Sequence, residues 1–183
     1  MEGTEASMPK LEILIAPDPI LKRPSERVER VDAATRRLMD DMLETMHAAN
    51  GIGLAAPQVG VLKRIIVVDV TARRKQPPQP YRMANPEILW RSEDVVAGEE
   101  GCLSLPDHFA DVMRAAQIRV RFLDQENEIR ELEADGLLAR CIQHEIDHLK
   151  GTLFVDHLSA LKRNIILRKL SKAKKQQVPA AAG

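Results

Sequence analysis

Cysteine and aromatic residues are scarce in this chain, and neither sign of charge predominates. Cys102 and Cys141 are its only cysteines, too few for a framework of disulfides and typical of a protein in a reducing cytosol. The 27 basic and 27 acidic side chains give a formal net charge of zero. This balance argues against a global attraction to nucleic acid or to a membrane surface, so any basic partner surface must be local.

Long apolar runs are missing as well. No run approaches the roughly 18 residues that a membrane-spanning helix requires. The first eleven residues contain Glu2 and Glu5, and they lack the basic start and apolar core of a signal peptide. We therefore expect a cytoplasmic protein with no membrane partner. Its 183 residues, 44% of them apolar, are enough for one compact domain.

The spacing of apolar residues predicts both helices and antiparallel strands. A helix is expected from an N-cap at Asp32 to a stop signal at Asn50-Gly51, because apolar residues recur there at helical spacing. Strands are expected at 65–70, 81–90 and 94–98, and a hairpin at 117–124 and 128–134. The segments 51–60 and 71–80 are expected to be loops, and a last helix is expected at 159–174.

A metal-binding pattern stands near the C-terminal end. The segment 137–151 has the length, apolar rhythm and ends of a helix, and within it His144, Glu145 and His148 form the string HExxH. Two histidines four residues apart share one helical face, so both imidazoles can bind one metal ion. Glu145 follows the first histidine and can act on a water molecule at that metal. Hydrolysis is therefore the first functional hypothesis.

A catalytic metal site of this kind needs a third protein ligand. Leu137, Cys141, His144 and His148 form one helical stripe that is predicted to be buried. Cys141 cannot share a metal with both histidines, because it lies roughly 10 Å from His148 along the helix. Cys102, in the segment EEGCLSLP, could supply a thiolate, although this segment is equally typical of a strand end or a turn.

Three blocks of sequence resemble the signature motifs of peptide deformylases in order and in spacing. They are GIGLAAPQVG at 51–60, EEGCLSLP at 99–106 and QHEIDHLKG at 143–151. The resemblance includes NPEI at 85–88 and FVDHLS at 154–159, and it covers most of the chain from residue 11 onward. The catalytic domain is expected at 1–175, and the terminal segment 176–183 is expected to be a disordered tail.

The resemblance implies a hydrolase that removes the formyl group from the N-terminal formyl-methionine of new bacterial polypeptides and releases formate. It implies Cys102, His144 and His148 as ligands of Fe²⁺, with Zn²⁺, Ni²⁺ or Co²⁺ able to take its place. Glu145 then becomes the general base and proton shuttle. The side-chain amide of Gln58 and the backbone N–H of Leu103 are the implied donors to the formyl oxygen.

Further positions are expected to contact the substrate. Gly53 would hold the substrate backbone closely, and Ile52, Leu137 and Cys141 could line a methionine pocket, with plain core packing as the alternative for these three. Arg140 departs from the pattern, because an apolar residue is common there; its aliphatic stem could still pack, but the preferred substrate side chain is left open.

Other polar residues around these motifs have more ordinary expectations. Phe109 stands where some relatives carry arginine, so contacts with the peptide backbone cannot be transferred to it. By resemblance, Arg114 is expected to pair with Asp147, which would help to hold a ligating histidine. His47, His108 and His157 are expected at or near the surface and not on the metal. The basic face of the last helix is expected to be solvated, or to dock on the ribosome as the resemblance implies.

Two other functions stay open at this point. An HExxH zinc peptidase would need a different, downstream third ligand, and His157 is the only later histidine. A noncatalytic metal-binding or ribosome-associated domain would not need both Glu145 and Gln58. The expected fold class is α+β: a single domain with small antiparallel sheets packed around the HExxH helix, and with an N-terminal and a C-terminal helix.

Overall fold

The computed structural model describes residues 11–177 and has an α+β architecture with two antiparallel sheets and three α-helices. The strands are β1 (Gly53–Ala55), β2 (Ile65–Val68), β3 (Tyr81–Arg91), β4 (Val95–Cys102), β5 (Leu105–Ala115), β6 (Gln117–Leu123) and β7 (Ile129–Asp135). The α-helices are α1 (Ala33–Ala48), α2 (Gly136–Leu149) and α3 (Ala160–Gln177). Short 3-10 turns lie at Pro19–Lys22, Ala56–Val59, Thr71–Arg74 and Phe154–His157. The predicted fold class is confirmed.

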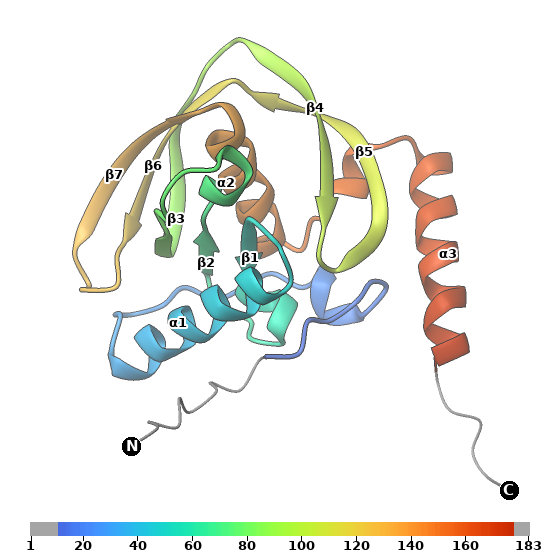
Figure 1. Cartoon of the computed structure of the whole chain (residues 1–183), viewed down its shortest axis with the longest axis horizontal. Coiled ribbons are helices and arrows are strands. Elements are labelled where there is room, and N and C mark those ends of the chain that lie inside the picture. Colours follow the sequence, from blue (N-terminus) through green and yellow to red (C-terminus); the bar gives the residue numbers. More distant parts are fainter. Residues whose placement is uncertain (1–10, 178–183) are drawn as a thin grey trace, which may run out of the picture.

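The main sheet has the strand order β1-β2-β3-β6-β7, and β4 pairs with β5 in a second sheet. Helix α2 packs against β1, β2 and β7 of the main sheet and against β5 of the second one, which places it at the centre of the fold (Figure 1). The helix that carries the HExxH string is therefore held from two sides. This is the arrangement that the sequence predicted for it.

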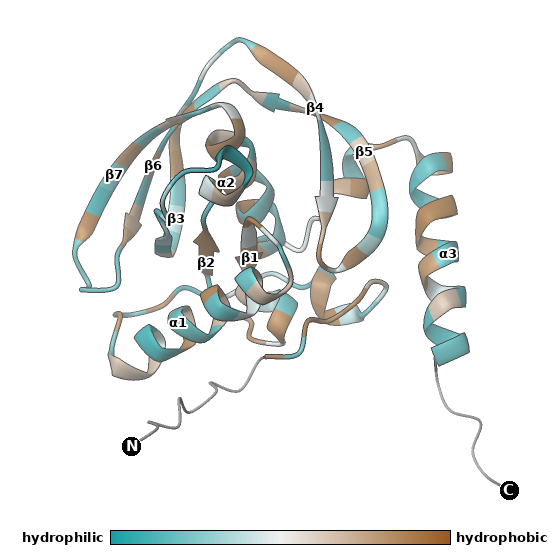
Figure 2. Cartoon of the chain, viewed as in Figure 1, coloured by the Kyte–Doolittle hydropathy of each residue, from teal (hydrophilic) through white to brown (hydrophobic). Residues whose placement is uncertain are grey.

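Strand β2 shows why the core has two layers. All four of its residues are buried, and the strand is hydrophobic along its length (Figure 2). Ile66 and Val68 pack in one cluster with α2, whereas Ile65 and Val67 pack in another with the methionines of α1. Because successive side chains point to opposite faces of a strand, β2 joins both layers. The prediction of a buried strand is confirmed, although it ends at Val68 and not at residue 70.

The hairpin formed by β4 and β5 was only half predicted. The expected strand at 94–98 continues to Cys102, and β5 was not predicted at all. The reason is an inverted pattern, in which Phe109 and Met113 face solvent while Arg114 is buried. A register shift between Gly101 and Cys102 interrupts the ladder just where the chain turns. Cys102 is the last residue of β4 and lies at the end of the hairpin where the chain turns into β5.

The loop predicted at 51–60 also needs correction. It contains β1, which pairs with β2, followed by the 3-10 turn at Ala56–Val59. The 71–80 loop likewise begins with a 3-10 turn. The glycines in this segment favoured a loop prediction. Strand β1 has only three residues, too few to show the alternating pattern of a strand.

The two outer helices largely follow the prediction. Helix α1 begins after Asp32, whose side chain accepts the Thr35 N–H at 2.8 Å. Helix α3 stands beside the β4–β5 hairpin (Figure 1) and runs three residues beyond the predicted end, to Gln177. The rest of the predicted tail, 178–183, lies outside the described residues. None of the helices among residues 11–177 is long and apolar enough to cross a membrane.

Candidate metal centre and active site

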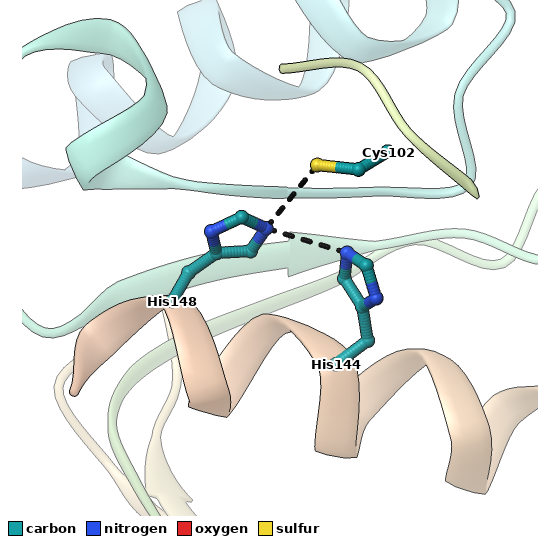
Figure 3. Close-up of side chains that lie close together, drawn as sticks. All are labelled: Cys102, His144 and His148. Atoms are coloured by element: carbon teal, nitrogen blue, oxygen red, sulfur yellow. Dashed lines mark hydrogen bonds between the residues drawn. The ribbon is translucent and has the colours of Figure 1, made fainter. Parts of the chain in front are cut away.

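Three potential ligands from two elements meet at the centre of the fold. Cys102 comes from the end of β4, while His144 and His148 project from adjacent turns of α2 (Figure 3). The Cys102 Sγ lies 3.4 Å from the His148 Nε2, which lies 3.3 Å from the His144 Nε2. Both histidines are buried, and the cysteine is half-buried. The structure thus brings together the three residues that were expected to be metal ligands.

These separations fit a tetrahedral metal ion. Bonds of about 2.0–2.1 Å to imidazole nitrogen and about 2.3 Å to sulfur place tetrahedral ligand atoms about 3.3–3.6 Å apart. The observed 3.3 and 3.4 Å fall in this range, and one sulfur with two nitrogens leaves a fourth position open. A thiolate and two neutral imidazoles also suit divalent zinc or iron. The donor set therefore fits a catalytic metal site.

The carboxylate of Glu100 fixes the orientation of one of the rings. Its Oε1 lies 2.8 Å from the His144 Nδ1, so Nδ1 carries the proton and donates it. The lone pair of the His144 Nε2 is then left facing Cys102 and His148. Partners of this kind hold a ligating histidine in one tautomer and one ring position. Sequence reasoning missed Glu100, although it lies two residues before Cys102 and so on the same face of β4.

Glu100 is in turn bound by Arg114 in a two-pronged pair, with both N···O distances at 2.9 Å. Burial alone would raise the pKa of Glu100, but hydrogen bonds from Arg114 and His144 hold it well below its ordinary value. The carboxylate therefore stays ionised. The predicted ion pair between Arg114 and Asp147 is present at 2.6 Å. Asp147 also contacts His157 at 2.8 Å. The acceptor for the His144 ring is therefore Glu100, whose Oε1 lies next to Nδ1, and not Asp147.

Glu145 points its carboxylate into the same centre. Its Oε1 lies 3.9 Å from the His144 Nε2, and its buried Oε2 has no hydrogen-bond partner among the described residues. Burial raises the pKa of Glu145 to about 7. A carboxylate with this pKa can accept and return a proton near neutral pH. Burial also lowers the pKa of His148 well below its ordinary value. For His144 the effect of burial is outweighed by hydrogen bonds with Cys102 and Glu100, which raise its pKa well above the ordinary value.

Gln58 lies beside Cys102 with a defined orientation. Its Oε1 accepts the backbone N–H of Ala55 at 2.9 Å, which turns the Nε2 toward the Cys102 Sγ at 3.5 Å and the Ser104 Oγ at 3.0 Å. The amide therefore presents N–H groups to the metal centre. Leu103, the other predicted donor, follows Cys102 directly in the turn between β4 and β5.

The predicted substrate-contact residues lie on α2 and at the start of β1. A Cβ added to Gly53 would lie 2.6 Å from the Glu145 Oε1 and 2.7 Å from the Cys141 Sγ, so only glycine lets β1 approach α2 this closely. Cys141 donates to the backbone carbonyl of Ile52 at 3.5 Å. Ile52 and Leu137 are half-buried against the same cluster. Burial raises the pKa of the Cys141 thiol well above its ordinary value, in keeping with a lining residue and not a ligand.

The remaining predicted positions lie outside the ligand cluster. His108 is half-buried on β5, and Phe109 is 63% exposed and faces solvent. His47, at the end of α1, contacts the buried Asp69 at 3.2 Å and belongs to the surface as predicted. Arg140 does not extend to solvent; its guanidinium lies between α2 and the β4–β5 hairpin.

Comparison with known proteins places these features in a family. Residues 10–164 match the family model described as polypeptide deformylase. The peptide deformylase of Mesorhizobium japonicum is 51% identical over 172 residues, which are 94% of this chain and 97% of that protein. The peptide deformylase of Phenylobacterium zucineum is 55% identical over 161 residues, covering 88% of this chain and 95% of that protein.

Solved structures agree with the sequence comparison. The crystal structure of peptide deformylase from Ehrlichia chaffeensis superposes with a TM-score of 0.87 at 43% identity, covering 92% of this chain and 98% of that one. A structure of peptide deformylase from the same organism in complex with actinonin also gives 0.87, at 45% identity, covering 92% of this chain and 99% of that one. The chain belongs to the polypeptide deformylase family.

Proposed function

We propose that this protein is a metal-dependent hydrolase that removes the N-formyl group from the formyl-methionine of newly synthesised polypeptides. One observation carries the proposal: a buried carboxylate, that of Glu145, stands without a partner among the described residues beside a cysteine and two histidines at tetrahedral separations. Membership of the polypeptide deformylase family supports the same reaction. The products are formate and a free amino group.

The ligands of the proposed metal ion are Cys102, His144 and His148. When bound, a divalent metal ion supplies a Lewis acid that polarises the formyl oxygen and makes water a stronger nucleophile. We infer Fe²⁺ as the metal used in the cell, and we expect Zn²⁺, Ni²⁺ or Co²⁺ to occupy the same ligands, because sulfur and imidazole bind all of these ions.

Glu145 performs the proton transfers of the proposed reaction. Its carboxylate takes a proton from the water molecule that attacks the formyl carbon. As the C–N bond breaks, the same group returns this proton to the departing nitrogen, which leaves as an amine. Burial raises the pKa of Glu145 above its ordinary value, which helps the group to accept and release a proton in one cycle.

Gln58 and Leu103 stabilise the charge that develops on the formyl oxygen. The Gln58 Oε1 is held by Ala55, so its amide N–H groups need no reorientation when the charge appears. The backbone N–H of Leu103 is the second proposed donor. Gly53 leaves room for the substrate main chain, and the half-buried Ile52 and Leu137 with the buried Cys141 would receive the unbranched methionine side chain.

Replacing Gln58 with glutamate tests this donor role. Gln58→Glu keeps the size of the side chain and an oxygen for the Ala55 N–H, but it removes the donor. We expect kcat to fall about 10²–10³-fold, as for other donors of this kind, while metal content is unchanged. Ser104→Ala, which removes one partner of the Gln58 amide but leaves its N–H groups in place, should cost far less. A Gln58→Glu enzyme with the parent kcat would refute the role.

The substrates emerge from ribosomes, so we propose that the protein acts in the bacterial cytoplasm. Helix α3 stands at the edge of the molecule beside the β4–β5 hairpin (Figure 1), and its basic residues are Lys162, Arg163, Arg168, Lys169, Lys172, Lys174 and Lys175. We expect this basic helix to be the element that contacts the ribosome. The described part of the chain gives no support to an HExxH peptidase with a later ligand, since His157 is engaged by Asp147.

The function is tested by measuring formate release from a formyl-methionyl peptide under anaerobic conditions, with metal analysis of the same sample. We expect release in proportion to metal content. A fully metal-loaded protein that releases no formate but binds peptide would favour the noncatalytic alternative.

A further inference from the structure

Arg140 makes an unusual set of contacts for a residue next to a metal site. Its Nη2 donates to the Val96 carbonyl of β4 at 2.7 Å. Its Nη1 lies 2.8 Å from both the Val112 carbonyl of β5 and the Glu100 Oε2, and 3.4 Å from the Gly98 carbonyl. One guanidinium on α2 therefore reaches both strands of the hairpin and the carboxylate that orients His144.

Gly98 makes room for this guanidinium. A Cβ at position 98 would lie 2.7 Å from the Cζ and Nε of Arg140, closer than a carbon atom can pack. The two residues lie 42 positions apart in the sequence but fit as a pair. The arginine is therefore seated in a space that the backbone of β4 provides, with a side chain only 12% exposed.

Glu100 is the point where Arg140 meets the metal centre. Its Oε1 is contacted by Arg114 and by the His144 Nδ1, and its Oε2 by Arg114 and Arg140. Four N–H groups therefore fill the acceptor sites of one buried carboxylate. The two guanidiniums also balance the charges of Glu100 and Asp147. Without Arg140, Glu100 would be left with an unfilled acceptor site in a buried place, which is costly.

We propose that Arg140 is a positioning residue that fastens the β4–β5 hairpin, and with it Cys102, to the helix that carries His144 and His148. The inference rests on the proposed function only in naming these three residues as ligands. Arg140 holds β4 at Val96, Gly98 and Glu100, all within six residues of Cys102. It therefore sets the distance between the sulfur and the two imidazoles.

Lysine cannot replace arginine in this role. The guanidinium presents a rigid planar fork of donors, whereas an ammonium group is a single point of charge on a flexible stem. Arg140→Lys thus keeps the positive charge near the metal centre but cannot hold two strands and a carboxylate together. Any effect of this variant on the ligands then comes from positioning and not from a change of charge.

The test measures how fast each cysteine of the metal-free protein reacts with a thiol reagent, with labelling at Cys102 and Cys141 followed separately by mass spectrometry. Cys141 is 5% exposed and sits on α2, so it reports general unfolding. We expect Arg140→Lys to raise the Cys102 rate about tenfold with no change at Cys141. We also expect zinc affinity, measured by competition with a chelator, to fall about tenfold, the lower end for groups that support a ligand.

Arg82→Lys is the matched control, because the Nε of Arg82 pairs with Asp40 at 2.8 Å far from the ligands. It should leave both cysteine rates and the zinc affinity unchanged. If Arg140→Lys does not fold, Gly98→Ala displaces the same guanidinium and should give the same result. Parent-like Cys102 labelling, equal acceleration at both cysteines, or unchanged zinc affinity would each overturn the proposal. Since no readout uses substrate, failure of the proposed function would appear only in the formate assay of the parent protein.

Discussion

Glu145→Gln is expected to bind metal like the parent protein while releasing formate about 10²–10⁴-fold more slowly, the range lost when a general base is removed. The substitution keeps the size of the side chain beside His144 but removes the group that takes the proton. The Oε2 of Glu145 has no partner among the described residues, so no structural hydrogen bond is lost there. Formate release and metal content should be measured on the same samples.

The exposed Glu44 of α1 offers a control, because Glu44→Gln makes the same chemical change away from the site. It should behave like the parent protein in both assays. Two results would contradict the assignment. A Glu145→Gln protein that turns over at the parent rate needs no base at this position, and one that loses its metal uses Glu145 as a structural element or ligand.

Cys102→Ala is expected to abolish tight metal binding and with it activity. Two imidazoles from one helix remain, but the thiolate that completes the site is gone. Metal at a hundredfold excess over its dissociation constant should stabilise the parent protein by about 2.7 kcal/mol, and this gain should disappear in the variant. Thermal unfolding with and without added zinc measures the difference directly.

Cys141→Ala is the comparison for this experiment. Cys141 lies on the same buried face of α2 as the histidines, yet it donates to the Ile52 carbonyl and stands outside the ligand cluster. Its removal should leave the metal-dependent stabilisation in place, whatever it does to substrate binding. If Cys102→Ala retained the stabilisation and Cys141→Ala lost it, the ligand assignment would be reversed.

Local spacing was enough to predict the parts of the site that lie on one element. His144, Glu145 and His148 follow from the period of a single helix, and α1 and the β6–β7 hairpin follow from similar short-range patterns. From the residues alone, the segment around Cys102 could supply a metal ligand or simply be a strand end or a turn. The resemblance to peptide deformylases favoured the ligand, because it links three blocks that lie far apart in the sequence.

The contacts that support the site could not be predicted, because they depend on pairing between distant segments. Glu100 and Arg114 face inward on β4 and β5, but β5 buries an arginine and exposes Phe109 and Met113, so its sequence does not show the usual alternation. Arg140 looked like a departure beside a substrate pocket. Only the packing of α2 against the hairpin shows that it reaches Glu100 and fits against Gly98.

The central claim is that Cys102, His144 and His148 hold one metal ion together, and X-ray absorption at the metal edge of the active enzyme tests it most directly. For the zinc form we predict one sulfur at about 2.3 Å and two imidazole nitrogens at about 2.0–2.1 Å, with the remaining ligand a light atom. The sulfur signal should be absent from any metal that Cys102→Ala retains. A shell of nitrogen and oxygen alone in the active parent enzyme, or one with two sulfurs, would contradict the account.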